Sequence, residues 1–265
     1  MLLSNQAIYI DLIKSGSSFI ENCLHSLCNH KTLLYYNQYN IVANLETIKY
    51  SINKSSNDHI GITKHIGITK HGPLYNKQLI LDNFCFISLR NPWLFYPSFY
   101  NYFNLKEHFS FEEWLVKIKN RDYTIRYVGL DYRRDIKSYS NCLIGMTDVA
   151  NSKKNLSEKE LNNWFEEYFF PNFYIIGLKE GLTQDFCKMF ENFHYMFDTK
   201  KNWKDTIEQI KEKDINFEGP ILKRYKNSNR LQNLNYKEFY TDTLIDLVYE
   251  LDKILIDKFN LKVPF

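Results

Sequence analysis

The sequence predicts an α/β fold with a central, mainly parallel sheet that is flanked by helices. Short apolar runs rich in β-branched and aromatic residues occur at 1–13, 84–89 and 173–177, which is typical of strands buried on both faces. Each run precedes a segment in which apolar residues recur at helical spacing, and such alternation indicates parallel strands joined by crossovers. With 265 residues and few Gly or Pro, we expect a single domain over 1–265.

Apolar spacing and capping residues predict the helices. The first is expected over 17–29, where one face carries Phe19, Ile20, Cys23, Leu24 and Leu27. Capping serines predict helices over 110–120 and from Ser157 to Pro171, and apolar periodicity predicts further helices over 183–193 and 236–259. Two stretches have weaker patterns: 31–50, where we expect a strand or two, and 199–235, which we expect to be mostly loop. Both are candidates for shaping a substrate site.

Composition argues against several classes of protein. The net charge of +3 is too small for a dedicated nucleic-acid binder. The five cysteines are scattered, with no CxxC and no Cys/His cluster at zinc spacing, so we predict no metal site. No apolar run approaches the ~20 residues of a membrane helix, and no secretory leader pattern is present. We therefore expect a soluble, cytoplasmic protein without a membrane partner; the oligomeric state stays open.

A candidate anion-binding loop follows the first predicted strand. Lys14 brings a positive charge, Ser15, Ser17 and Ser18 bring hydroxyl donors, and Gly16 lets the backbone approach a bulky anion. The free N–H groups at the start of the next helix and the helix dipole add to this. The loop is not a Walker A motif, because the lysine precedes the only glycine. An ordinary strand-turn-helix joint capped by serine is the alternative interpretation.

A second candidate anion site follows the strand predicted at 84–89. Arg90 lies at its carboxyl end, where open α/β sheets bind ligands, and Ser98 follows near the expected start of a helix. Arginine can bind a phosphate through two N–H groups, and the serine adds a third donor. Alternatively, the arginine caps the strand and the serine caps the helix.

Together, these two segments resemble the cofactor-binding motifs of sulfotransferases that use 3′-phosphoadenosine 5′-phosphosulfate (PAPS). Lys14-Ser-Gly-Ser-Ser-Phe19 is similar to their 5′-phosphosulfate loop, and Arg90-Asn-Pro with Ser98 is similar to their 3′-phosphate segment. Phe173 to Glu180 looks like the Gly-x-x-Glu strand of the carbohydrate branch. The chain departs from that branch at Ile13, where proline is usual, and at Phe95, where many members have a second arginine.

The resemblance implies a P-loop-like sulfotransferase fold. It also implies that the protein transfers a sulfuryl group from PAPS to an acceptor hydroxyl and releases 3′-phosphoadenosine 5′-phosphate (PAP). The resemblance to the carbohydrate branch favours a hydroxyl on a saccharide. It implies that Lys14 and residues 15–19 bind the leaving phosphate, and that Arg90 and Ser98 bind the 3′-phosphate. His71 is the favoured general base. His65 is the second candidate, because a tandem repeat of His-Ile-Gly-Ile-Thr-Lys makes it ambiguous which histidine corresponds to the base of the family. Glu180 is the third candidate. No metal is required. A kinase with a variant phosphate loop and a non-catalytic nucleotide-binding module remain the alternatives.

Overall fold

The computed structural model describes residues 2–4, 6–10, 12, 15–29, 34–36, 42–44, 80–102, 104–120, 138–140, 143–144, 156–212 and 234–265. The strands are β1 (Leu2–Ser4), β2 (Ala7–Ile10), β3 (Leu34–Tyr36), β4 (Val42–Asn44), β5 (Phe84–Ser88) and β6 (Phe173–Ile176). The longer helices are α1 (Ser17–Leu27), α4 (Pro92–Tyr102), α5 (Phe111–Lys119), α8 (Glu158–Trp164), α10 (Leu182–Phe193), α11 (Trp203–Lys211) and α13 (Asp242–Phe259). Short turns of helix are η2 (Leu105–Glu107), η3 (Phe165–Phe169, of π type), α9 (Phe170–Asn172), η4 (His194–Met196) and η6 (Tyr236–Phe239).

The strands form a six-stranded sheet in the order β4-β3-β1-β2-β5-β6. Strands β2, β5 and β6 are parallel neighbours, whereas β1, β3 and β4 join the sheet by antiparallel pairing. The α/β class is therefore confirmed, but the sheet is mixed rather than mainly parallel. The single strand expected over 1–13 is a hairpin, in which Ser4 lies opposite Ala7 and two residues link the strands.

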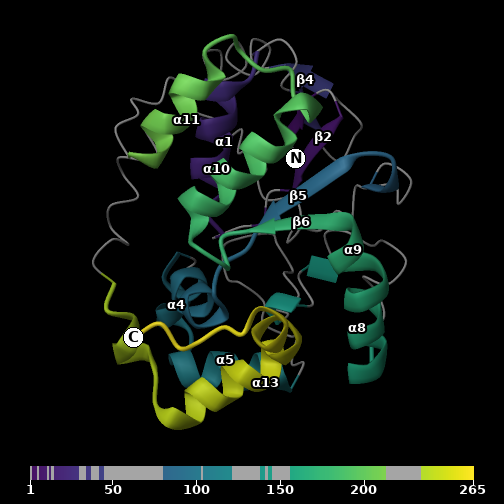
Figure 1. Ribbon diagram of the computed structural model, residues 1–265. Coiled ribbons are helices and arrows are strands. Elements are labelled where there is room, and N and C mark those ends of the chain that lie inside the picture. Colours follow the sequence, from purple (N-terminus) through teal and green to yellow (C-terminus); the bar gives the residue numbers. More distant parts are fainter. Residues whose placement is uncertain are drawn as a thin grey trace.

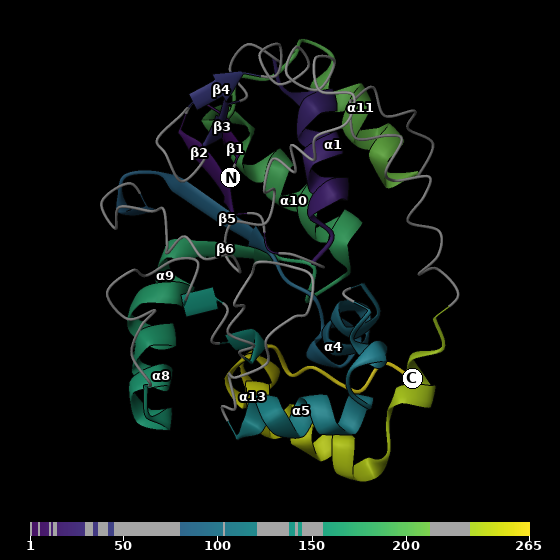
Figure 2. The ribbon, with the colours of Figure 1, turned by 180° about the vertical axis from the view of Figure 1, so that it is seen from behind.

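Helices cover both faces of the parallel strands (Figures 1 and 2). Alternate residues such as Ile8, Ile10 and Ile87 face a core shared with α4, α5, α8 and α13. Their neighbours Tyr9 and Phe86 face a second core shared with α1, α10 and α11. Because successive side chains of a strand point to opposite faces, these strands are apolar throughout. The continuous apolar runs in the sequence were the signal of this burial.

Most predicted helices are present, and local capping explains why. The serines at 110 and 157 both form capping boxes, with Glu113 and Glu160. Helix α11 lies inside the segment expected to be mostly loop; it buries Ile207 and Ile210 and leaves a strongly charged outer face. The helical run from Ser157 ends at Asn172, close to the expected stop, and α10 starts at Leu182. The chain has no helix, within these described ranges, that is long and apolar enough to cross a membrane.

Candidate functional site

The three parallel strands end at one edge of the sheet, and the segments that follow them touch one another there. Leu89 donates its N–H to the carbonyl of Ile176 at 2.9 Å. On the other side of β5, Ile10 lies opposite Ile87. Ligands of open α/β sheets bind outside the carboxyl ends of the strands. This edge therefore brings together the loop before α1, the segment around Arg90, and the turn after β6.

A chain of hydroxyl groups joins the loop before α1 to strand β5. Tyr9 Oη lies 2.7 Å from Ser88 Oγ, which lies 2.9 Å from Ser15 Oγ, and Ser15 donates to the carbonyl of Leu12 at 2.6 Å. Each hydroxyl has a single proton, so the chain has one consistent direction, from Tyr9 through Ser88 and Ser15 to Leu12. The Ser15 proton is thereby used within the protein. Its hydroxyl positions the loop and does not supply the free donor that the sequence suggested.

Gly16 begins helix α1 in a conformation that side chains disfavour. Its φ of 93° and ψ of 15° are left-handed, and a Cβ there would lie 2.3 Å from Cδ2 of Leu182. The N–H groups of Phe19 and Ile20 both donate to the Gly16 carbonyl. Those of Ser17 and Ser18 come first in the helix and have no acceptor within it. These two amides lie at the helix start, where N–H groups can bind an anion.

Arg90 is held at both its ends by tyrosine hydroxyls. Its backbone N–H donates to Tyr139 at 2.9 Å, and its Nη2 donates to Tyr236, also at 2.9 Å. The guanidinium carbon lies 5.6 Å from the centre of the Tyr236 ring. Neither tyrosine was singled out from the sequence, because both contacts join residues far apart in the chain. A half-buried cation is thus fixed at the carboxyl edge of β5.

A buried carboxyl group, that of Asp252, is linked to Arg90 through Tyr139 and Tyr96. Asp252 accepts hydrogen bonds from Tyr96 Oη at 2.5 Å and from the N–H and hydroxyl of Ser140 at 2.8 and 2.7 Å. Tyr96 in turn accepts the N–H of Tyr139 at 3.1 Å. Burial raises the pKa of Asp252, although its hydrogen bonds oppose that shift. The sequence did carry a signal for this residue, since Asp252 lies eight positions after Leu244 on the apolar face of its helix.

Phe95 packs against Tyr139 and Tyr96, the two tyrosines that link Arg90 to Asp252. It is 2% exposed, and its ring stacks on Tyr139 with 4.0 Å between centroids. Phe95 is therefore a core aromatic, packed against the residue that binds the Arg90 backbone.

Ser98 lies inside helix α4, which begins at Pro92, so the expectation that it sits near a helix start is wrong. The residue is fully buried, and its hydroxyl has no hydrogen-bond partner in the part of the chain that the structure describes. An unpaired buried hydroxyl costs about 1–3 kcal/mol. A ligand oxygen that accepted this hydrogen bond would recover that cost.

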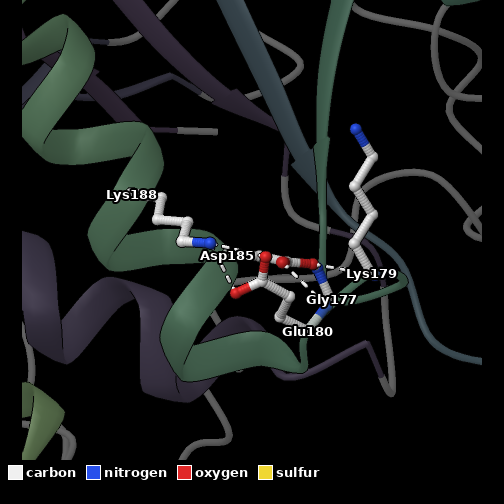
Figure 3. A network of polar contacts seen from close by, with 5 residues as sticks. All are labelled: Gly177, Lys179, Glu180, Asp185 and Lys188. Carbon is white, nitrogen blue, oxygen red and sulfur yellow. Dashed lines mark hydrogen bonds and ion pairs between the residues drawn. The ribbon is translucent and has the colours of Figure 1, made fainter.

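The turn after β6 is organised by Asp185 (Figure 3). Its carboxylate accepts the N–H groups of Gly177, Lys179 and Glu180 at 2.8, 3.0 and 3.0 Å. Lys188 donates to both carboxylate oxygens of Glu180, and this hydrogen bonding raises the pKa of Lys188. The turn amides are thus used by an internal carboxylate, and Glu180 forms an exposed ion pair. Asp185 lies five residues after the glutamate of the Gly-x-x-Glu pattern and was not singled out from the sequence.

The structure thus brings Ser15, Gly16, Ser17 and Arg90 to one edge of the sheet. Phe19 turns toward α10, where its ring meets Phe186 edge-on at 6.4 Å, so its side chain serves packing. Ser18 is described only as part of helix α1. Lys14, His71 and the alternative base His65 lie outside the described residues. Within the described ranges, no group of three or more His, Cys, Asp or Glu side chains could hold a metal ion.

Comparison with known proteins does not assign the chain to a family. No protein-family model, no curated protein and no solved structure matches it.

Proposed function

We propose that this protein is a sulfotransferase that binds PAPS at the carboxyl edge of β2, β5 and β6 and transfers its sulfuryl group to an acceptor hydroxyl, with a saccharide as the favoured acceptor. The observation that carries the proposal is the hydrogen bond of 2.9 Å between Ser15 and Ser88. It ties the loop at the start of α1 to the strand that presents Arg90. Two sequence motifs 74 residues apart, counted from Gly16 to Arg90, thereby flank one edge.

The finer architecture proposed is that of the P-loop-like sulfotransferases. Its support is the succession of strand β2, a loop with left-handed Gly16, and helix α1, beside the parallel strand β5. The antiparallel strands β1, β3 and β4 are additions on the β2 side of the sheet.

The residues present fit the two ends of the cofactor. At one end, the amides of Ser17 and Ser18 and the α1 dipole favour the 5′-phosphate, and Lys14 adds a charge for the bridging oxygen as the phosphate leaves. At the other end, Arg90 and the unpaired hydroxyl of Ser98 suit a 3′-phosphate. PAPS supplies the activated sulfuryl group. In-line transfer then depends on positioning and charge stabilisation.

A base near the acceptor completes the proposal. His71 keeps that role as the prediction from the sequence, with His65 as the alternative. Glu180 is less suited, because Lys188 donates to both of its oxygens and holds them in an exposed ion pair.

Calorimetric titration tests the binding step. The purified chain is titrated with PAP and, separately, with ATP and magnesium. We expect binding of PAP, and a loss of about 10- to 150-fold in affinity for Lys14→Ala and for Arg90→Ala, because a hydrogen bond to a charged group contributes about 1.5–3 kcal/mol. The matched control is Lys119→Ala, which removes an exposed cation paired with Glu250 and leaves PAP affinity unchanged.

Turnover tests the transfer step. His71→Ala is expected to bind PAP normally and to lose sulfuryl transfer in a screen of saccharide and other hydroxyl acceptors. Binding of ATP with magnesium but not of PAP refutes the proposal in favour of a kinase. Binding of PAP without turnover on any acceptor favours a non-catalytic binding module.

A further inference from the structure

The Arg90 guanidinium already has a side-chain partner within the protein, the hydroxyl of Tyr236. We propose that Tyr236 is a specificity-determining residue that positions the Arg90 guanidinium and makes the site select nucleotides that carry a 3′-phosphate. The inference rests on the proposed function and deepens it, because it names the residue that sets up the 3′-phosphate subsite.

The geometry leaves both groups free to bind an anion. A guanidinium has five N–H donors, and a single bond from Nη2, 2.9 Å long, joins Arg90 to Tyr236. The remaining donors include a pair that can bind two oxygens of one phosphate. Tyr236 accepts in this hydrogen bond, so its own proton stays available for a phosphate oxygen. Tyrosine and arginine can therefore act on the same anion without competing.

The segment that bears Tyr236 is itself held by packing on helices α4 and α5. Tyr236 opens η6, and the residues after it are anchored: the Phe239 ring meets Phe111 edge-on at 5.2 Å, and Tyr240 Oη donates to the carbonyl of Trp93 at 2.9 Å. Helix α4 also carries Ser98, whose hydroxyl is buried and unpaired within the described chain. Helix α4 thus carries one of the two proposed 3′-phosphate donors, Ser98, and contacts the segment that bears the tyrosine.

The other end of Arg90 is equally fixed. Its N–H binds Tyr139, and the N–H of Tyr139 binds Tyr96, which donates to the buried Asp252. A long side chain that is held at its backbone and at its guanidinium loses less conformational freedom when a ligand arrives. Such preorganisation strengthens binding without a new contact to the ligand. The benefit is confined to ligands that reach Arg90, which is the basis of the selectivity.

The test compares two nucleotides that differ only in the 3′-phosphate. Dissociation constants of wild-type and Tyr236→Phe proteins are measured by calorimetry for PAP and for adenosine 5′-phosphate. We expect Tyr236→Phe to weaken PAP binding about 3- to 10-fold, as for loss of a hydrogen bond, and to change adenosine 5′-phosphate binding less than 2-fold. The control is Tyr195→Phe, in which an exposed tyrosine loses the same hydroxyl group; neither affinity is expected to change.

A double-mutant cycle separates positioning from a general structural effect. In an Arg90→Ala background, Tyr236→Phe is expected to weaken PAP binding less than it does in the wild-type protein, because the positioning part of its effect needs Arg90. An equal loss for both nucleotides, a loss of the same size with and without Arg90, or no loss for PAP overturns the role of Tyr236 while leaving the proposed function intact. If the wild-type protein fails to bind PAP, both proposals are overturned.

Discussion

Gly177 occupies the point where strand β6 leaves the sheet beside Arg90, and Gly177→Ala tests how closely these segments fit. The φ of Gly177 is +97°, and a Cβ at this position would lie 2.4 Å from the carbonyl oxygen of Leu89. Real Cβ atoms stay beyond 3.0 Å. Because the obstructing atom belongs to the backbone, no side-chain rotation can relieve the clash.

The cost has two parts. A left-handed φ costs an L-residue about 1–2 kcal/mol. Overpacking against a fixed backbone adds about 1–3 kcal/mol, since Leu89 must move away from β6 and strain its 2.9 Å bond to Ile176. We therefore expect the free energy of unfolding to fall by about 2–5 kcal/mol, out of the 5–15 kcal/mol typical of natural proteins.

Urea unfolding followed by circular dichroism measures this loss, and Gly181→Ala is the matched control. Gly181 has the same φ of +97°, but the nearest atom to its added Cβ is Gln184 Oε1 at 3.8 Å. The control therefore carries the cost of a positive φ without the clash. If the two variants lose the same stability within about 0.5 kcal/mol, the close approach of Gly177 to Leu89 is refuted.

Two further predictions concern other buried contacts. Gly16→Ala is expected to lower the free energy of unfolding by about 1–3 kcal/mol. Adding Leu182→Ala should recover part of that loss, because it removes the Cδ2 atom that would lie 2.3 Å from the new Cβ. If urea unfolding shows that the losses of the two single variants simply add in the double variant, the contact is contradicted. Burial raises the pKa of Asp252, so the folded protein keeps a proton on this carboxyl group that the unfolded chain releases near pH 4. The contribution of Asp252 therefore makes the free energy of unfolding fall as pH rises from about 4 through the raised pKa. Asp252→Asn should flatten this fall and the exposed Asp246→Asn should not; equal slopes for the two variants contradict the assignment.

The elements that could be predicted from the sequence are those with local causes. The capping boxes at Ser110 and Ser157 depend on residues three positions apart, and both form. Strand β5 and helix α1 follow from apolar spacing within a single element. Helix α11 escaped prediction because its surroundings are highly charged, and the β1–β2 hairpin because two apolar stretches were read as one strand.

The candidate site was predictable only in part, for the same reason. Arg90 and Gly16 are marked by their residue type and their position after an apolar run. Their surroundings depend on contacts between residues far apart in the sequence: 146 positions separate Arg90 from Tyr236, and 156 separate Tyr96 from Asp252. Ser15 is an example, because its hydroxyl is hydrogen-bonded to Ser88 on strand β5 and to the carbonyl of Leu12. The sequence alone does not show that β5 brings Ser88 to this position.

By itself, the sequence determined the α/β class, most helices, and two segments suited to anions, because periodicity, capping and charge act over a few residues. The tertiary structure decided that those segments share one edge of a mixed sheet. It also decided which of their polar groups remain free: Ser15 is satisfied internally, whereas the hydroxyl of Ser98 is unpaired among the described residues. Hydrogen-bond satisfaction depends on which distant elements meet, and no local pattern encodes that.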